Sequence, residues 1–303
     1  MINEKIILPT FLIVGVQKAG TTSIYNYLQA HPQVYMSPVK ETNFLERDWE
    51  EIEAAQRNKN GIISLEDYAK LFEGVKDEIA IGEASPNYIF HYQSSAERIK
   101  KYVPQAQLII VLRNPIERAY SDYLMHLRDA IGYRPLAEQI KNSAHKSFIL
   151  RKGFYYEPIK YYLDVFGWEQ IKVFFYDDLC ENSQKFMQEM YGYIGVDPNF
   201  KVDTSEKVQT AKIPKNQAIN NLLQRQNPFR TLAATTLKTL MPLEARQKIR
   251  DRLIDFNSQS KKEVPLSPEE RQQLIELYRE DILKLQDLIN KDLSHWLDGK
   301  SNK

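Results

Sequence analysis

Short apolar segments alternate with segments of helical periodicity through residues 10–180. The apolar segments lie at residues 10–16, 34–36, 79–82, 108–112 and 171–176. Helical patterns lie between them, at 21–30, 94–102, 115–128 and 155–166. The segment at 108–112 reads Leu-Ile-Ile-Val-Leu without a polar position, which predicts a strand covered on both faces. Strands that alternate with helices predict an α/β fold with a central parallel sheet of about five strands.

The second part of the chain has a different pattern. We expect the strands to end near residue 183, because a helical pattern covers 183–194 and a polar stretch at 197–215 predicts a loop. A long amphipathic helical region follows at 265–296, in which Ser267 suits an N-cap and Pro268 the first helical position. We therefore predict one domain over residues 1–303, with a core at about 10–180 and a mainly helical part at about 183–303 packed on it.

The first apolar segment leads into a glycine-bounded loop and a helix start, with the sequence Val-Gly-Val-Gln-Lys-Ala-Gly-Thr-Thr-Ser from residue 14. Backbone N–H groups from Val16 to Thr22 and the helix N-terminus can converge on an anion. Hydroxyl donors to the same anion are available from Thr21, Thr22 and Ser23. A Walker loop carries its lysine directly after the second glycine, whereas here Lys18 lies inside the loop and Thr21 follows Gly20. We therefore expect a P-loop-like three-layer fold that binds a phosphate group but does not cleave a nucleoside triphosphate between its phosphates.

A second chemical signal follows the apolar segment at 108–112. This strand ends in Arg113, and Pro115 then begins a helix on which Ser121 lies two turns further on. A nucleoside triphosphatase usually carries an acid there to organise magnesium, whereas the planar fork of arginine suits a terminal phosphate. Alone, the loop also fits an ordinary turn with an exposed lysine, and Arg118 fits a surface salt bridge. The two signals in this order favour an anion site at the carboxyl ends of the strands.

These segments resemble the sulfotransferases that use 3′-phosphoadenosine 5′-phosphosulfate (PAPS), in particular bacterial enzymes related to the heparan sulfate and glycan branch. The loop at 14–23 is similar to their 5′-phosphosulfate loop, and residues 113–123 are similar to their pattern R-[ND]-P-x-x-R-x-x-S-x-Y. Further similar segments lie at 40–45 (Lys-Glu-Thr-Asn-Phe-Leu), 82–88 (Gly-Glu-Ala-Ser-Pro-Asn-Tyr), 153–166 and 173–179. The resemblance covers about residues 10–180 well and is weaker in the C-terminal part.

The resemblance implies how the donor is bound. PAPS is the sulfuryl donor, 3′-phosphoadenosine 5′-phosphate (PAP) is the product, and no metal is required. Lys18 contacts the 5′-phosphate and the oxygen that bridges it to the sulfuryl group, where it can stabilise the departing charge. Arg113 and Ser121 hold the 3′-phosphate. The full set of expected donor-binding residues is Gln17, Lys18, Ala19, Gly20, Thr21, Thr22, Ser23, Arg113, Ser121, Tyr155, Lys212 and Lys215. Lys212 and Lys215 would replace a late glycine-rich loop that this sequence lacks, and a solvated loop explains them equally well.

Sulfuryl transfer to an alcohol needs a general base, because the alcohol pKa is far too high for spontaneous proton loss at pH 7. Glu41 matches the glutamate that serves as base in the glycan enzymes of the resembling family. Glu83 is the second candidate, with a supporting role that orients another site group as its alternative. An ion pair with Lys40 is the alternative role for Glu41. A histidine serves in the small-molecule branch of the family, and His91 and His126 lie near the motif helices.

Composition narrows the class of protein. The formal net charge of +1 argues against a nucleic-acid binder. The single cysteine, Cys180, excludes a disulfide within the chain and favours a reducing compartment. The N-terminus lacks the pattern of a secretory signal, and no apolar run reaches the ~18 residues of a membrane span. We therefore expect a cytoplasmic protein.

The acceptor is predicted only as a class. A carbohydrate, a glycolipid or a secondary metabolite with a hydroxyl or amine group would fit. Ala84 stands where heparan-type enzymes often carry a lysine, which weakens the case for a heparan-like acceptor. A P-loop kinase and a non-catalytic nucleotide-binding module are the alternative functions.

Overall fold

The computed structural model describes residues 6–49, 61–129, 134–203, 212–214, 258–260 and 265–299. The chain divides into two compact units. The first comprises Met1–Arg118, Lys152–Val208 and Tyr278–Leu297. The second comprises Ala119–Arg151, Gln209–Leu277 and Asp298–Lys303. Because the division passes through helices α4 (Pro115–Arg128) and α13 (Pro268–Ile289), each unit contains part of both helices. A single domain over residues 1–303 stays a prediction.

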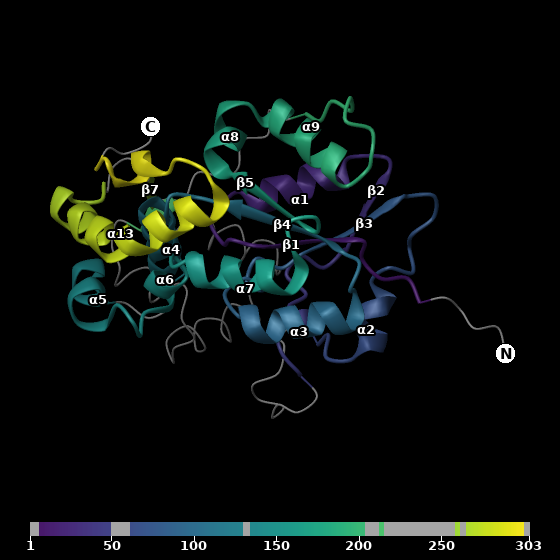
Figure 1. Ribbon diagram of the computed structural model, residues 1–303, viewed down its shortest axis with the longest axis horizontal. Coiled ribbons are helices and arrows are strands. Elements are labelled where there is room, and N and C mark those ends of the chain that lie inside the picture. Colours follow the sequence, from purple (N-terminus) through teal and green to yellow (C-terminus); the bar gives the residue numbers. More distant parts are fainter. Residues whose placement is uncertain are drawn as a thin grey trace, which may run out of the picture. The chain divides into compact units, whose positions relative to one another are not determined.

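The first unit is built on a sheet of five parallel strands (Figure 1). The strands are β1 (Phe11–Gly15), β2 (Val34–Met36), β3 (Ala80–Ala84), β4 (Gln107–Leu112) and β5 (Ile171–Phe175). They lie in the order β2-β3-β1-β4-β5, so β1 is central. All of β1 and all of β4 after its first residue are buried, as their uninterrupted apolar sequences predict. The predicted α/β fold with about five parallel strands is confirmed.

Helices cover both faces of this sheet. Figure 1 shows α1, α8 and α9 on one face and α3 and α7 on the other. Their bounds are α1 (Thr21–Gln29), α3 (Tyr92–Tyr102), α7 (Tyr156–Phe166), α8 (Tyr176–Glu181) and α9 (Ser183–Tyr193). The chain moves one way from β1 to β2 and the opposite way from β3 to β4. Right-handed crossovers in opposite directions place their helices on opposite faces, so the loops after β1 and β4 meet at one edge beside β1.

The helices predicted at 21–30, 94–102, 115–128, 155–166 and 183–194 are all present, each within two residues of the expected ends. The shorter elements η1 (Phe44–Glu46), α2 (Leu65–Lys70), α5 (Leu136–Ser143), α6 (Phe148–Arg151) and α8 were not predicted, whereas η4 (Ser294–Leu297) falls at the end of the predicted helical region. The prediction that the strands end near residue 183 is wrong. In the second unit, β6 (Lys212–Pro214) pairs antiparallel with β7 (Ser258–Ser260). Strands of three residues are too short to show alternation, so β6 was hidden in a stretch that predicted a loop.

Helix α13 begins as the sequence predicts. The Ser267 hydroxyl accepts a hydrogen bond from the Glu270 N–H (3.1 Å), and the Glu270 carboxylate accepts one from the Ser267 backbone N–H (3.3 Å). This reciprocal arrangement is a capping box. In the part of the chain that the structure describes, neither α13 nor another helix combines the length and apolar character needed to cross a bilayer.

Asp281, in the second half of α13, caps another helix of the first unit. Its carboxylate accepts hydrogen bonds from the backbone N–H groups of Tyr155 (2.7 Å) and Tyr156 (3.2 Å), where α7 begins. Burial raises the pKa of Asp281 to about 6, and the two backbone donors oppose the rise. The ionised carboxylate suits the positive end of the α7 dipole, but its burial keeps the proton bound up to a higher pH than in the unfolded chain.

Asp281 should make stability depend on pH between about 4 and 6. Because its folded pKa lies above its ordinary value, the stability that it contributes is full below about pH 4 and is lost as the pH rises through about 6. Asp281→Asn does not titrate. We expect the free energy of unfolding of the wild type to fall relative to Asp281→Asn by about 3 kcal/mol across this window. Denaturation curves of both proteins at pH 4 to 7 measure the difference, and a difference that is constant with pH would contradict the assignment.

Candidate active site

The loop after β1 leads into a helix whose N-terminus is capped by no side chain. Gly20 is the N-cap of α1, in a left-handed conformation with φ of +78°, and no side-chain hydrogen bond caps the helix. The first N–H groups of an α-helix have no partner inside the helix, so they can bind an anion. The buried Ser23 hydroxyl also has no hydrogen-bond partner among the described residues. These features fit a phosphate or phosphosulfate group.

The structure corrects one detail of the predicted loop. The Val16 N–H donates to the Val111 carbonyl of β4 (3.0 Å), so it belongs to the sheet and does not point into the anion site. Ala19 is buried, and Thr22 is exposed beside the buried Thr21. The anion-binding N–H groups are therefore expected from the later part of the loop and the start of α1.

The two anchors predicted from the sequence are in direct contact. The Arg113 guanidinium, just after β4, donates from Nη1 to the Lys18 carbonyl (2.7 Å). Lys18 has φ of +70°, a conformation that costs a non-glycine residue free energy and that this bond helps to hold. The guanidinium also lies 4.5 Å from the ring centroid of Tyr176, at the start of α8. One hydrogen bond to Lys18 leaves other guanidinium donors of Arg113 for a phosphate.

Other predicted donor residues have different positions. Tyr155 is buried, and its hydroxyl donates to the Arg113 carbonyl (2.9 Å), so it supports the backbone at the strand end. Ser121 lies on α4 in the second unit, and Lys212 lies on β6, also in the second unit. Lys215 lies outside the described residues. Arg118 is fully buried, so its interpretation as a surface salt bridge is wrong.

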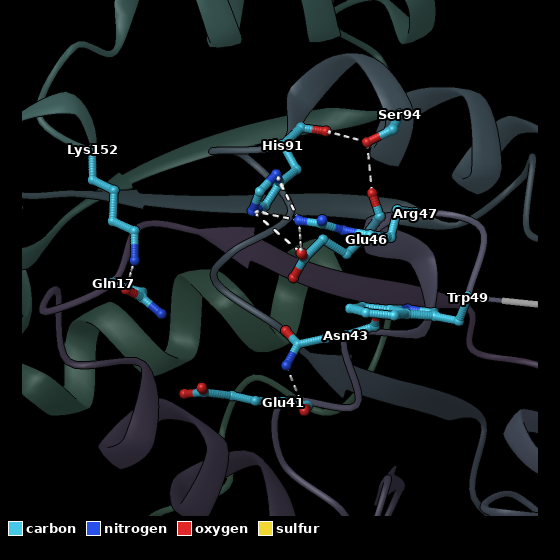
Figure 2. Close-up of polar contacts among 9 residues, drawn as sticks. All are labelled: Gln17, Glu41, Asn43, Glu46, Arg47, Trp49, His91, Ser94 and Lys152. Carbon is cyan, nitrogen blue, oxygen red and sulfur yellow. Dashed lines mark hydrogen bonds and ion pairs between the residues drawn. The ribbon is translucent and has the colours of Figure 1, made fainter. Parts of the chain in front are cut away.

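Lys152 is a site residue that the sequence reasoning missed. Its Nζ donates to the side-chain oxygen of Gln17 (2.6 Å), directly before Lys18 in the loop (Figure 2). It also lies 5.5 Å from the ring centroid of Phe90. The available signal was its position directly before the motif that begins at Gly153. A basic side chain at the edge of the loop adds positive charge beside the predicted anion site.

Glu41 lies at the carboxyl edge of the sheet, after β2. Its N–H donates to the Ala84 carbonyl at the end of β3 (2.9 Å), and its backbone has φ of +62°. Its side chain is 42% exposed and forms an ion pair with Lys40 (2.8 Å). The expected ion pair is therefore present, and it leaves Glu41 accessible at the edge where the β1 loop also lies.

Glu83 has a different environment, although it is only one strand away. It is fully buried in β3, and its carboxylate accepts hydrogen bonds from four hydroxyl groups. A carboxylate enclosed in this way cannot approach an acceptor hydroxyl without breaking the enclosure. The geometry favours Glu41 over Glu83 as a base.

A charged cluster follows Glu41 along the chain and includes one of the candidate histidines. Glu46 is buried and contacts both Arg47 and the Nε2 atom of His91 (3.3 Å), as Figure 2 shows. Burial raises the pKa of Glu46, while the charges of Arg47 and Lys152 oppose the rise. Lys152 therefore binds Gln17 through a hydrogen bond, and its positive charge also acts on Glu46. The His91 ring contacts the Glu46 carboxylate and the Arg47 guanidinium. These contacts make His91 a weaker candidate base than Glu41.

Local contacts account for His126, the second candidate histidine, and for the buried His31. His31 is buried against Tyr191 and Phe200, and its ring contacts the Asp197 carbonyl (3.0 Å). His126 lies 3.8 Å from Asp122 in the second unit. Within the ranges that the structure describes, His, Cys, Asp and Glu side chains form no group of three suited to a metal ion.

The sulfotransferase domain profile matches residues 8–253 of this chain. This chain belongs to the sulfotransferase family. A solved sulfotransferase from Alicyclobacillus acidocaldarius is 27% identical in sequence and superimposes with a TM-score of 0.70, and the match covers 96% of this chain and 99% of that one. The fold therefore has a counterpart over nearly the full length of another family member.

Curated relatives are similar over part of their length. Carbohydrate sulfotransferase 15 of Mus musculus is 27% identical to this chain over an aligned length of 270 residues. The match covers 70% of this chain and 47% of that protein. Bifunctional heparan sulfate N-deacetylase/N-sulfotransferase 3 of Homo sapiens is 28% identical over 208 residues, which cover 64% of this chain and 23% of that protein. This chain thus spans less than half the length of these curated relatives.

Gly20→Ala should disturb the loop more than the same change at a matched glycine. A Cβ at Gly20 would lie 2.7 Å from Cδ2 of Leu179, whereas Gly195, with the same φ of +78°, has open space around it. Both substitutions cost about 1–2 kcal/mol of backbone strain, but only Gly20→Ala also forces the Leu179 side chain or the loop beside α1 to move. We expect Gly20→Ala to weaken PAP binding about ten-fold or more and Gly195→Ala to leave it unchanged. Calorimetry compares them, and equal affinities would contradict the placement of the anion at this helix.

Proposed function

We propose that this protein transfers a sulfuryl group from PAPS to a hydroxyl or amine group of a saccharide. The observation that carries this proposal is the contact between Arg113 and the Lys18 loop (2.7 Å), which brings two cationic anchors to one edge of the sheet. PAPS has two separate phosphate positions, so two separate anchors suit it. Membership of the sulfotransferase family supports the same donor.

The donor-binding residues divide between the two ends of PAPS. The N-terminus of α1 and the hydroxyls near it bind the 5′-phosphate, and Arg113 binds the 3′-phosphate. During transfer the acceptor oxygen forms a bond to sulfur, and the bond from sulfur to the bridging oxygen breaks. The electron pair stays on the 5′-phosphate of PAP, where Lys18 stabilises the added negative charge.

Glu41 takes the proton of the acceptor hydroxyl. It is accessible, it lies at the carboxyl edge of the sheet, and its backbone is bound to the end of β3 beside β1. Glu83, enclosed by hydroxyl groups, has no comparable access.

A saccharide is the acceptor class that the relatives favour. The names of the two curated relatives refer to carbohydrate and to heparan sulfate, and they are 27% and 28% identical to this chain over the matched residues. Ala84, which replaces a lysine often present in heparan-type enzymes, favours a less acidic saccharide. A glycolipid and a hydroxylated secondary metabolite remain alternative acceptors, and a cytoplasmic location stays a prediction.

Two competing functions make different demands on the loop. A P-loop kinase needs a lysine after the second glycine, whereas Thr21 follows Gly20 here. A non-catalytic nucleotide-binding module has no need for an accessible carboxylate such as Glu41 beside the loop. Neither of these two functions explains why Lys18, Arg113 and Glu41 all lie at one edge of the sheet.

Nucleotide affinity tests the donor assignment. We expect the full chain to bind PAP in calorimetry without added metal, and to bind ATP with magnesium at least ten-fold more weakly, because the 3′-phosphate contact is lost. Adenosine 5′-phosphate is the matched control, since it lacks only the 3′-phosphate. Tight binding of ATP with magnesium, and none of PAP, would refute the proposed donor.

Replacement of Glu41 tests the proposed base. Glu41→Gln keeps the shape of the side chain but cannot take a proton, so we expect the transfer rate to fall by about 10²–10⁴-fold with unchanged PAP affinity. Lys40→Met is the control, because it removes the ion pair and leaves the carboxylate. If Lys40→Met were as inactive as Glu41→Gln, the ion pair and not proton transfer would be the role of Glu41.

A further inference from the structure

Glu83 is a buried carboxylate to which the proposed reaction assigns no step. Each of its oxygens accepts hydrogen bonds from two hydroxyl groups. The donors are Thr42 (3.0 Å) and Ser85 to Oε1, and Tyr88 (2.9 Å) and Tyr68 (3.3 Å) to Oε2. An ionised carboxylate offers about four acceptor positions, so the four hydroxyls can satisfy it fully. Burial raises the pKa of Glu83, and the four hydroxyl donors oppose the rise.

Three of these hydroxyl oxygens also bind the backbone that follows Glu41. The bonds run from the N–H of Asn43 to Ser85 (3.0 Å), from that of Phe44 to Thr42 (3.3 Å) and from that of Leu45 to Tyr88 (3.2 Å). Each hydroxyl thus accepts from an amide and donates to the same carboxylate. Negative charge on Glu83 polarises the hydroxyls in the direction that strengthens their bonds to the amides. Three consecutive amides are therefore tied to one buried group.

The tied segment has a backbone that needs such support. Glu41 has φ of +62° and Asn43 has φ of +53°, both in the left-handed region that is unfavourable for most non-glycine residues. The Asn43 side chain donates to the Glu41 carbonyl (3.0 Å), as Figure 2 shows, and the Trp49 indole donates to the Asn43 carbonyl (2.8 Å). The conformation that leaves Glu41 accessible is therefore held by these bonds and by the bonds to the hydroxyls around Glu83.

We propose that Glu83 is a positioning residue for Glu41. Through the hydroxyls of Thr42, Ser85 and Tyr88 it fixes residues 41–45 in the strained conformation that presents the Glu41 carboxylate at the edge of the sheet. This inference rests on the proposed function, because it takes Glu41 as the base. It explains why a buried carboxylate on β3 is joined by hydroxyl bridges to the backbone segment that follows the accessible Glu41.

A role in stability alone is the competing explanation. A buried carboxylate with four hydroxyl partners would then hold β3, α2 and the segment after β2 together, with no effect on catalysis beyond a lower melting temperature. The two explanations differ in the kinetic parameter that changes. Misplacement of a base lowers kcat and leaves donor binding intact, whereas general loosening lowers the fraction of folded protein.

Thr42→Val removes one bridging hydroxyl with little change of shape, and Thr42→Ser keeps that hydroxyl. We expect Thr42→Val to lower kcat about 10–100-fold while PAP affinity in calorimetry changes less than two-fold. We expect Thr42→Ser to retain most of the wild-type kcat. Tyr88→Phe, which removes a second bridge, should show the same separation of kcat from PAP affinity. It provides an independent test if Thr42→Val does not fold.

The same substitution in an inactive-base background separates this inference from the proposed function. If the bridge acts through Glu41, Thr42→Val should not lower the residual activity of Glu41→Gln further. An equal loss in both backgrounds, or wild-type kcat in both Thr42→Val and Tyr88→Phe, would overturn the positioning role. Wild-type activity of Glu41→Gln would instead refute the proposed base, which is a different result.

Discussion

The hydrogen bond from the Arg113 guanidinium to the Lys18 carbonyl is the interaction on which the donor site depends. It joins residues 95 positions apart, at the ends of the neighbouring strands β1 and β4. Lys18 has a left-handed backbone, which the bond to Arg113 steadies. Tyr155 in turn holds the Arg113 carbonyl, and Asp281 caps the helix that follows Tyr155. The site is thus preorganised by a chain of contacts that extends from the loop to α13.

The fold, and the positions of the proposed donor anchors within it, could be predicted because their signals are local. Gly20 and Lys18 lie within one loop, and Arg113 directly follows an uninterrupted apolar strand. The parallel sheet then brings the two loops to one edge without further information. The paired strands β6 and β7 could not be predicted in this way, because three residues give no periodic pattern.

The local pattern of residues does not separate the two glutamates, and only the family resemblance favoured Glu41. Glu41 follows one short apolar segment and Glu83 lies at the end of another, so the sequence patterns around the two residues are alike. Their environments differ because Glu83 points into a group of hydroxyls contributed by separate segments, whereas Glu41 remains accessible. Lys152 was missed for the same reason, since its contact with Gln17 spans 135 positions. Burial and long-range pairing, which decide these roles, are properties of the folded chain.

Transfer of labelled sulfate from PAPS to saccharide acceptors is the most direct test of the central claim. The full chain should label an acceptor and release PAP without added metal, and Lys18→Ala should abolish the transfer. Saccharides, glycolipids and hydroxylated metabolites assayed side by side identify the acceptor class. Transfer by Lys18→Ala at the wild-type rate would contradict the account. So would transfer of phosphate from ATP with magnesium in place of sulfate from PAPS.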